Sequence, residues 1–408
     1  MTRQLLLRSL LALTIAAPSL KAQDASLKNE VHASMQKGLA YLLTKQQSSG
    51  AWGDPAVPGA QPAITALALM SIRADSTRRP DELSDSGNLA DSTRRPDELS
   101  DSGKLAVAYL LSVQKEDGGI YTEKPLSTYN TALALTALSF APLDEKGRQA
   151  ALKARTYLVS LQGKFDDKAQ PDPKSTFDSP YDGGIGYTSK TTYSDLSNTH
   201  FALEALYYSK NLYADHPGEE KKSAKLDFEA AIKFVSRCQN LKATNDQAWA
   251  SDDATNKGGF VYRPGESKAD PVKLPDGKEA LRSYASMSYA GMLSFIYADM
   301  KPDDQRLTAV KEWLSKNYSV QENPGMGQQG LYYYYHTMAK ALTIAKMPVL
   351  TLADGTKVNW RQDLAKQLFN GQQKDGSWAN ENGRWMEKDP VLSTCYAVLA
   401  LAQVASGL

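Results

Sequence analysis

One aspartate and two histidines are the side chains of this 408-residue sequence best suited to acid–base chemistry. Asp195 is the strongest candidate for a general acid, and His200 follows it by five residues. His336 could serve as a general base, because an unperturbed histidine has a pKa of about 6.5. We therefore predict Asp195 and His336 as catalytic residues. Each also has a structural interpretation, since aspartate is a favoured helix N-cap and a buried histidine can be a hydrogen-bonded core residue.

Four consecutive tyrosines, at positions 332–335, precede His336. A cavity that contains several tyrosines could bind an extended apolar chain, or stabilise a cation over the ring faces. The same run is also compatible with simple packing of a helix against its neighbours.

Motifs for several other kinds of chemistry are missing from the sequence. There is no GxxxxGK[ST] phosphate loop and no GxSxG nucleophile elbow. A zinc site needs three or four correctly placed ligands, and the chain has four histidines and no CxxC pair. We expect no metal and no cofactor. Cys238 and Cys395 both fall in predicted apolar helices, so we expect buried free thiols, with a disulfide as the alternative.

An imperfect repeat must position these residues. A helix ends in an aromatic-aliphatic pair, a glutamine follows, and then comes a turn in which a glycine precedes an aromatic residue. The six turns are predicted at 50–52, 119–121, 184–187, 258–260, 330–332 and 376–378. The glutamines are Gln46, Gln114, Gln162, Gln239 and Gln373, and Tyr318 takes this place in the fifth copy. A fixed pattern of this kind indicates a repeat architecture.

A second, more apolar helix follows each turn. Each of these helices carries a hydroxyl residue near its start, and the six are Thr65, Thr131, Thr199, Ser288, Thr337 and Thr394. Their alanine- and leucine-rich runs have high helix propensity and are apolar on nearly every side, which is typical of buried helices. The preceding helices carry charges on one face. We therefore predict six outer and six inner helices that alternate along the chain.

The first copy of the repeat resembles the QW motif of squalene cyclases. The matching residues are Lys37-Gly38, Tyr41-Leu42, Gln46 and the Gly50-Ala51-Trp52 turn. The resemblance covers about residues 30–408 and identifies the chain as similar to terpenoid cyclases and protein prenyltransferases. It implies an all-α fold, an (α/α)6 toroid of six helical-hairpin repeats. Because the motif is a structural clamp, it says more about the fold than about a reaction.

The family's catalytic motifs are not found in this sequence. The DxDD acid of squalene–hopene cyclases and the DCTAE string of oxidosqualene cyclases are both missing. The segment 335–337 resembles the histidine part of the prenyltransferase zinc motif, but the Asp-x-Cys part is missing. Whether the protein is an enzyme therefore stays open. If it is one, the resemblance implies a cyclase-like or transferase activity.

A toroid brings the starts of the inner helices together around a central depression, and this predicts where a ligand would bind. When the repeats are aligned on the hydroxyl, polar and aromatic residues gather near it in repeats three, four and five, with one contribution from repeat two. A few polar groups at the rim of an apolar cavity are the usual composition of a ligand site. The predicted substrate-binding residues are Asn130, Asn198, His200, Tyr284, Tyr289, Tyr333 and Tyr334.

Three long connections interrupt the repeats. Residues 74–89 recur almost unchanged at 90–105, and this duplication predicts a long solvated loop containing Arg78, Arg79, Arg94 and Arg95. Two insertions, at 163–195 and 240–284, join outer to inner helices. Long loops at one rim often carry function, although these two could simply cover the mouth of the ring. The aspartate pairs at 166–167 and 252–253 fall in these loops.

The first 22 residues are typical of an export signal. Arg3 and Arg8 give a positive start, and an apolar run from Leu10 to Ala17 follows, too short to span a bilayer. We predict a signal at 1–22, an exported toroid domain at 23–408, and no later transmembrane segment. The 47 basic and 46 acidic residues balance, which argues against a nucleic-acid partner.

Three functions fit these features. The first is an exported protein that acts on or binds an isoprenoid-like apolar ligand in the central cavity. The second is a non-catalytic binding or scaffold toroid. The third is a polysaccharide lyase or glycosidase, which would need paired carboxylates or an arginine-acid set such as Arg263, Glu266 and Arg282. Fold alone does not choose between them.

Overall fold

The computed structural model describes residues 20–74, 99–163 and 179–408. Residues 1–19 of the predicted signal, residues 75–98 of the duplicated loop with its four arginines, and the 166–167 aspartate pair lie outside these ranges. Within them, none of the helices combines the length and the apolar character needed to cross a membrane.

Six inner and six outer helices alternate along the described chain, as predicted. The inner helices are α2 (Gln61–Arg73), α4 (Ser127–Leu138), α6 (Leu196–Tyr208), α9 (Ala285–Tyr297), α11 (Leu331–Ile344) and α13 (Pro390–Ala405). The outer helices are α1 (Leu20–Thr44), α3 (Asp101–Ser112), α5 (Glu145–Ser160), α8 (Phe228–Ser236), α10 (Gln305–Lys316) and α12 (Trp360–Gly371).

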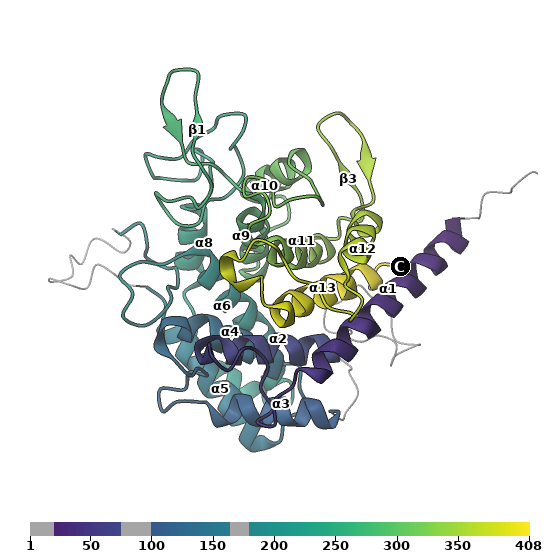
Figure 1. Ribbon diagram of the computed structural model, residues 1–408. Helices are drawn as coiled ribbons and strands as arrows, with labels where there is room; N and C mark the ends of the chain where they lie inside the picture. The colour runs from purple at the N-terminus through teal and green to yellow at the C-terminus, as the bar shows by residue number, and fades with distance from the viewer. Residues whose placement is uncertain (1–19, 75–98, 164–178) are drawn as a thin grey trace, which may run out of the picture.

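The inner helices form a closed ring. Each packs on the next in chain order, and α13 packs on both α2 and α1, so the two ends of the chain lie side by side (Figure 1). This confirms the predicted (α/α)6 toroid. Additional elements are the short helix α7 (Pro217–Lys222) and the 3-10 helices η1 (Pro58–Ala60), η4 (Lys124–Leu126), η5 (Ser209–Tyr213) and η6 (Arg384–Met386).

The strands of the described chain form two short antiparallel hairpins, which project from one edge of the ring (Figure 1). In the first, β1 (Val272–Lys273) pairs with β2 (Glu279–Ala280), with Val272 opposite Ala280. In the second, β3 (Leu350–Thr351) pairs with β4 (Lys357–Val358), with Leu350 opposite Val358. Both lie in connections between helices, so they leave the all-α architecture intact.

The glutamine of the repeat ties each hairpin to the next one. Its Nε2 donates to the carbonyl of the turn glycine and to a carbonyl in or at the cap of the following outer helix; the five glutamines are Gln46, Gln114, Gln162, Gln239 and Gln372. Gln372 donates to Ser34 O at 2.9 Å, which closes the ring between its last and first repeats.

The predicted glutamine of the sixth repeat, Gln373, was one residue too late. Trp52 Nε1 donates to Leu42 O in the first repeat, and Trp378 Nε1 donates to Leu368 O in the sixth. Leu368 therefore matches Leu42, and the glutamine four residues later is Gln372.

The turn glycine is required by backbone geometry in five repeats. Gly50, Gly118, Gly183, Gly258 and Gly376 have φ between 84° and 93°. A Cβ on any of them would lie 2.1–2.7 Å from a carbonyl oxygen of the next outer helix. Only glycine tolerates both conditions. Each turn therefore fixes how closely adjacent hairpins approach.

The positions of three predicted turns were wrong. In repeats two and three the positive-φ glycines are Gly118 and Gly183, so isoleucine, at Ile120 and Ile185, holds the place of the aromatic residue. In repeat five, Gly330 is the N-cap of α11 and residues 331 and 332 begin that helix. In repeats two and three, isoleucine occupies the buried position that an aromatic ring holds in other repeats. A pattern based on aromatic residues does not detect it.

The repeated hydroxyl, the glutamine and the turn glycine together form a set of contacts that we call the clamp. Thr65, Thr131, Thr199, Ser288 and Thr394 each accept a hydrogen bond of 2.9–3.0 Å from the backbone N–H of the residue that ends the turn. Repeat five again differs: Thr337 donates to Tyr333 O one turn earlier, and Tyr318 Oη reaches Asp363 of the next outer helix at 3.0 Å. The hydroxyls are therefore structural, and they leave the inner faces of the ring for other side chains.

Candidate functional site

Loops from neighbouring repeats cover the N-terminal ends of the inner helices, which we call the ring mouth. Asn130 Oδ1 accepts from Ala63 N of α2 at 3.0 Å, and its Nδ2 donates to Gly59 O. Asn323 caps α9 through Ser286 N, and Glu387 caps α11 through Tyr333 N at 2.8 Å. The structure therefore places Asn130, a predicted ligand-binding residue, in a helix-capping role.

The two insertions deliver tyrosines to the ring mouth. Tyr187 O accepts from Thr128 N of α4, and Tyr262 O accepts from Leu196 N of α6 at 2.9 Å. The Tyr262 hydroxyl donates to the Tyr187 hydroxyl at 3.0 Å. Both insertions thus cap inner helices with backbone carbonyls and place their aromatic rings together.

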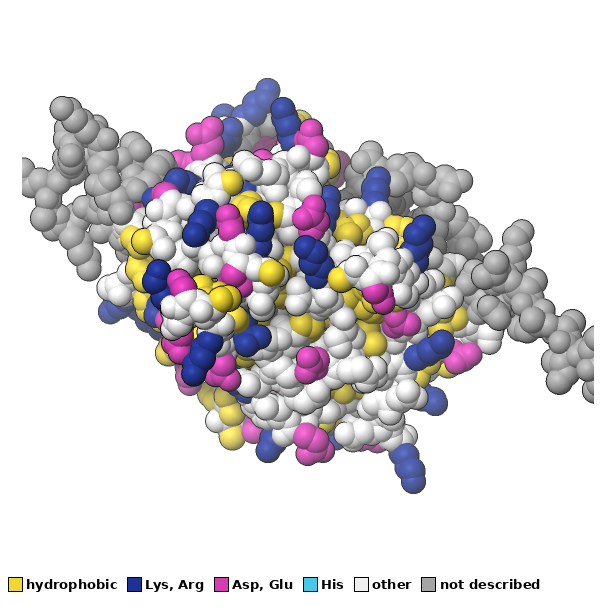
Figure 2. Space-filling view, turned by 90° about the horizontal axis from the view of Figure 1, so that it is seen from above, with side chains coloured by type: hydrophobic (Ala, Val, Ile, Leu, Met, Phe, Trp, Pro, Cys, Tyr) yellow, Lys and Arg dark blue, Asp and Glu magenta, His cyan; other side chains and the backbone are white. Residues whose placement is uncertain are grey.

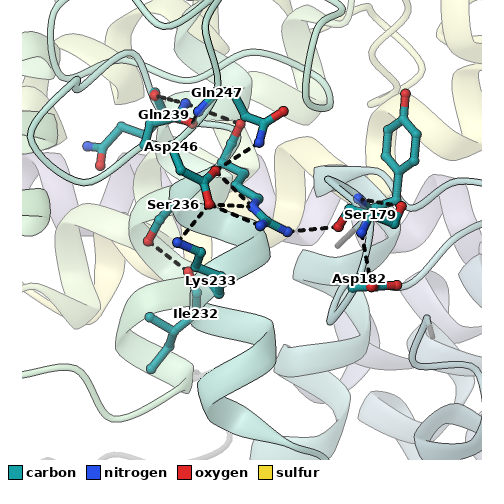
Figure 3. Close-up of polar contacts among 11 residues, drawn as sticks. Ser179, Asp182, Ile232, Lys233, Ser236, Gln239, Asp246 and Gln247 are labelled. Carbon is teal, nitrogen blue, oxygen red and sulfur yellow. Dashed lines mark hydrogen bonds and ion pairs between the residues drawn. The ribbon is translucent and has the colours of Figure 1, made fainter. Parts of the chain in front are cut away.

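A polar cluster on α8 holds these insertions in place (Figure 3). The buried Arg237, which is 5% exposed, donates through Nε to Asp246 of the second insertion at 2.9 Å and through Nη1 to Ser179 O of the first at 2.8 Å. Lys233 Nζ lies 2.8 Å from Asp246. Figure 3 shows Lys233, Ser179 and Asp246 converging on this point from three segments. The loops at this side of the mouth are therefore anchored.

Asp195 is buried at the start of α6. Its two oxygens accept hydrogen bonds from Asn198 N at 2.9 Å and Asn198 Nδ2 at 2.8 Å, so it is the N-cap of the helix. Burial raises the pKa of Asp195 to about 6, although the bonds from Asn198 oppose this shift. Below that pH the carboxyl group carries a proton, which is the condition for a general acid.

Arg263 and Glu266 lie beside the tyrosines of the mouth. The Arg263 guanidinium stacks 3.9 Å from the centre of the Tyr193 ring and forms an ion pair with Glu266, which also pairs with Lys268. The Arg282 side chain instead donates to Asp270 O at 2.8 Å, although its carbonyl accepts from Ser267, next to Glu266. The sequence-predicted arginine-acid set is therefore only partly brought together.

Four aromatic side chains meet at the centre of the ring, and we call them the upper aromatic layer: Tyr129, Phe201, Tyr333 and Tyr396. Their ring centroids lie 5.1 Å apart for Tyr129–Phe201, 5.9 Å for Phe201–Tyr333 and 6.0 Å for Tyr333–Tyr396. The hydroxyls of Tyr129 and Tyr396 lie 2.8 Å apart. These residues belong to α4, α6, α11 and α13, which are not all neighbours, so their contacts cross the ring axis. Aromatic rings from opposite sides of the ring therefore meet across the axis at this level.

A polar layer lies one turn deeper and consists of His200, Glu204, His336 and Lys340. Lys340 Nζ lies 2.5 Å from Glu204 Oε1, and His200 Nε2 lies 3.8 Å from Glu204 Oε2. The side chains of Glu204, His200 and Lys340 are 3%, 2% and 13% exposed. Burial, and next the Lys340 charge, lower the pKa of His200 to about 3. The pKa of His336 lies well below its usual value for the same two reasons.

Three tyrosines of the adjacent helices α6 and α9 lie below the polar layer. Tyr297 of α9 lies 5.2 Å from Tyr207 and 5.9 Å from Tyr208, measured between ring centroids. Along α6, Phe201, Glu204 and Tyr208 are spaced by about one helical turn, so they lie on one face. We call Tyr207, Tyr208 and Tyr297 the lower aromatic layer. Along α6 the side chains are therefore aromatic, then polar, then aromatic.

Two predicted residues point away from the axis. Tyr334 Oη donates to Ser319 O, in the loop after outer helix α10, at 2.6 Å. The ring of Tyr289 packs 5.9 Å from that of Tyr334. Tyr284 caps the start of α9 and is buried, and among its charged neighbours are Asp195 and Arg384. The axis therefore includes Tyr333, His200 and His336 from the predicted set, with Asp195, Asn198 and Tyr284 near the mouth.

Sequence reasoning missed Tyr129, Phe201, Tyr396, Glu204 and Lys340. For the three aromatic residues, the sequence contains no pattern that separates them from ordinary core residues. Glu204 and Lys340 do, because each is a lone charge within an otherwise uncharged apolar helix. Such a residue is costly to bury and marks a partner or a site.

The described residues contain no group of three His, Cys, Asp or Glu side chains arranged to hold a metal ion. Cys238 and Cys395 are buried free thiols, as predicted. The aspartates at 252 and 253 form hydrogen bonds within their own loop: Asp252 accepts from Lys242 N, and Asp253 accepts from Ser251 Oγ. Basic and acidic side chains alternate over the face seen in Figure 2, without a large patch of one sign.

No protein-family model matches the sequence, and a comparison with curated proteins finds no significant match. Solved structures do match over nearly the whole chain. A variant of the type II terpene cyclase MstE from Scytonema, in complex with its product merosterolic acid A, is 12% identical, covers 94% of this chain and 99% of its own, and has a TM-score of 0.52. Another MstE variant, bound to its substrate geranylgeranyl dihydroxybenzoate, gives a TM-score of 0.50.

A glycosidase matches equally well. An inactive double aspartate-to-asparagine variant of the GH76A α-1,6-mannanase from a Salegentibacter species, in complex with α-1,6-mannotriose, is 12% identical, covers 92% of this chain and 99% of its own, and has a TM-score of 0.52. The fold shared by these proteins is the α/α toroid. Since the two enzymes act on an isoprenoid compound and on a sugar, the shared fold does not specify a ligand.

Proposed function

We propose that this toroid binds an isoprenoid-like, extended apolar ligand at the ring mouth and axis. The observation that carries the proposal is the upper aromatic layer, where rings from four inner helices meet across the axis. Aromatic faces bury large apolar areas and attract developing positive charge. Tyr129 and Tyr333 are the partly exposed members of this layer, so they are the ones that a ligand entering from the mouth would contact.

Asp195 is the candidate acid if the ligand is also transformed. A proton-initiated reaction on an isoprenoid needs a carboxyl group that is protonated in a site with little water. Asp195 is buried, and its pKa of about 6 leaves it protonated in weakly acidic conditions. Any such activity should fall as the pH rises through 6. Asp195 is also the N-cap of α6. The two roles can be separated by Asp195→Asn, because asparagine retains the cap and has no acidic proton.

Two other functions are less well supported. A glycosidase needs two carboxyl groups that face each other across the substrate. The described carboxylates near the axis and mouth already have partners: Glu204 pairs with Lys340, Glu266 pairs with Arg263 and Lys268, and Asp195, Glu387 and Asp389 cap α6, α11 and α13. A non-catalytic scaffold is favoured by one observation, the contact of aromatic rings with one another across the axis. We therefore propose ligand binding as the function, with Asp195 as the acid if the ligand is also transformed.

Binding can be measured by calorimetry with geranylgeraniol and, for comparison, α-1,6-mannotriose. We expect the isoprenoid to bind and the trisaccharide not to bind. Tyr333→Leu, which keeps apolar volume but removes a ring from the upper aromatic layer, should weaken binding by about tenfold. The matched control is Tyr121→Leu, because the Tyr121 hydroxyl bonds Asp117 in a turn remote from the axis. Binding of mannotriose alone would contradict the proposal.

We also propose that residues 1–22 direct export. The charged start and the short apolar run support this. Fractionation of cells that produce the full chain, or the chain from residue 23, tests it. The full chain should be found outside the cytoplasm and the shortened chain inside it; equal distribution of the two would contradict the proposal.

A further inference from the structure

The rarest side chains of the inner helices meet at one level of the ring. Across all six inner helices, Glu204 is the one acidic residue, Lys340 the one lysine, and His200 and His336 the two histidines. They come from α6 and α11, which lie on either side of α9. Their convergence on the axis therefore brings together groups from two helices that are not adjacent in the ring.

Three buried polar atoms of this layer have no hydrogen-bond partner within the described residues: His200 Nδ1, His336 Nδ1 and Glu204 Oε2. The 3.8 Å between His200 Nε2 and Glu204 Oε2 is too long for a hydrogen bond. Asn198 Oδ1, two residues before His200, is a fourth unpartnered buried atom. Buried polar atoms are nearly always satisfied, so these four atoms call for partners from bound water or from a ligand.

A purely structural role explains only part of this layer. The Lys340–Glu204 pair could lock α6 to α11, but buried ion pairs are weak stabilisers because of their desolvation cost. Such a lock needs neither histidine and does not explain the unpartnered atoms. The polar layer also lies directly below the proposed ligand site, since His336 stacks on Tyr396 at 5.5 Å and His200 lies 5.1 Å from Phe201.

We infer that the polar layer binds the head group of the ligand, and that this head group is an uncharged hydroxyl. This inference rests on the proposed function. A hydroxyl donates one hydrogen bond and accepts others. It would donate to Glu204 Oε2 and accept from an imidazole N–H of His200 or His336. One group would thereby satisfy two of the unpartnered atoms, and the apolar chain would remain in contact with the upper aromatic layer.

The charges of the layer argue against an anionic head group. Lys340 and Glu204 neutralise each other, and both histidines are uncharged near neutral pH, because burial depresses their pKa values. A carboxylate or diphosphate would add uncompensated negative charge to a buried site beside Glu204, which is strongly unfavourable. Isoprenoid alcohols are therefore favoured over the corresponding acids and diphosphates.

The test compares geranylgeraniol, geranylgeranyl diphosphate and the C20 hydrocarbon phytane by calorimetry with the full protein. The key variant is the double substitution Glu204→Met with Lys340→Met, which replaces the ion pair by apolar side chains of similar size and is expected to fold. His216→Ala, at a half-exposed histidine outside the ring axis, is the matched control for His200→Ala. Circular dichroism checks that each variant is folded.

We expect the wild type to bind the alcohol at least about tenfold more tightly than the diphosphate or the hydrocarbon. The double variant and His200→Ala should lose that preference and keep hydrocarbon binding, while His216→Ala should behave as the wild type. Equal affinities, tighter binding of the diphosphate, or an unchanged preference in the double variant would overturn the inference and leave the proposed function standing. Failure of all three ligands to bind the wild type would overturn both.

Discussion

Repeats one and five of the ring differ in a way that separates scaffold from site. In repeat one, Gln46, Gly50 and Thr65 tie the turn to its own inner helix and to the next hairpin. In repeat five, Tyr318 replaces the glutamine, and Thr337 bonds its own helix instead of a turn. The inner helix of repeat one, α2, carries no charge before its last residue, whereas α11 of repeat five carries His336 and Lys340.

The clamp is thus complete in repeat one, whose inner helix is plain, and it is lost in repeat five, whose inner helix supplies half of the polar layer. Repeat three shows that the two features can coexist, because α6 keeps its clamp and also carries His200 and Glu204. The clamp therefore determines how hairpins pack, whereas the charged axial residues are the candidates for ligand binding. The predictions below test each half of this division.

The largest effect should come from breaking the ion pair on one side. Glu204→Met leaves the Lys340 ammonium buried without a counter-charge, which should lower the free energy of unfolding by about 3–5 kcal/mol. The double Met variant should be close to the wild type. Denaturant unfolding followed by circular dichroism measures both. A single variant as stable as the double variant would show that the pair is not a coupled unit.

Substitution of a turn glycine should have the second-largest effect on stability. Gly183→Ala would place a Cβ 2.1 Å from Ala230 O at a φ of 84°, so we expect a loss of about 3 kcal/mol or more in unfolding free energy. Gly265→Ala is the matched control, since Gly265 has a similar φ of 79° and nothing within 4 Å of the added Cβ; it should cost about 1 kcal/mol. Equal losses at both sites would mean that backbone strain alone, and not the approach of the next helix, makes the glycine necessary.

Asp195 should give the wild type a characteristic pH dependence. Its pKa is raised from 3.8 to about 6 on folding, so the native state binds more protons than the unfolded state between these values. Wild-type stability, relative to Asp195→Asn, should therefore fall as the pH rises from 4 to 7, by at most about 3 kcal/mol. Thermal and denaturant unfolding across this range measure the difference. Asp144→Asn, at the exposed N-cap of α5, controls for replacement of a capping aspartate. A difference that grows in the opposite direction would show that burial does not dominate at Asp195.

The hydroxyl clamp should give the smallest effect. Thr65→Val leaves the buried Trp52 N–H without its acceptor and should cost about 1–3 kcal/mol. Thr337→Val loses only a bond to the carbonyl one turn earlier and should cost less than about 1 kcal/mol. Denaturant unfolding measures both variants. If Thr337→Val were the more damaging of the two, repeat five would depend on a clamp after all.

Most of the fold could be predicted from the sequence, because the clamp depends on local spacing. A glutamine, a turn glycine and a hydroxyl recur in the same order, and together they predicted alternating outer and inner helices. The errors lay in the details of single repeats, including the assignment of Gln373 in place of Gln372. The pattern required an aromatic residue where Ile120 and Ile185 serve equally well, and it accepted Gly330 as a turn glycine although it caps a helix.

The site was harder to predict, because its contacts join residues far apart in the chain. Alignment on the hydroxyl found Tyr333, His200 and His336, which lie within one turn of it. The same alignment also selected Tyr289, and the tyrosine run added Tyr334, since sequence position near a helix start does not tell which way a side chain points. Lys340 and Glu204 lie 136 residues apart and meet only because the ring closes, although each could have been noticed as a lone charge in an apolar helix.

The most direct test of the central claim, that the ring axis is a ligand site, is a crystal structure of the protein with geranylgeraniol. Density for the chain is expected against Tyr129 and Tyr333, with the hydroxyl within hydrogen-bonding distance of Glu204 or His200. Ligand density on the outer surface of the ring, with the two aromatic layers and the polar layer between them unchanged, would contradict the claim.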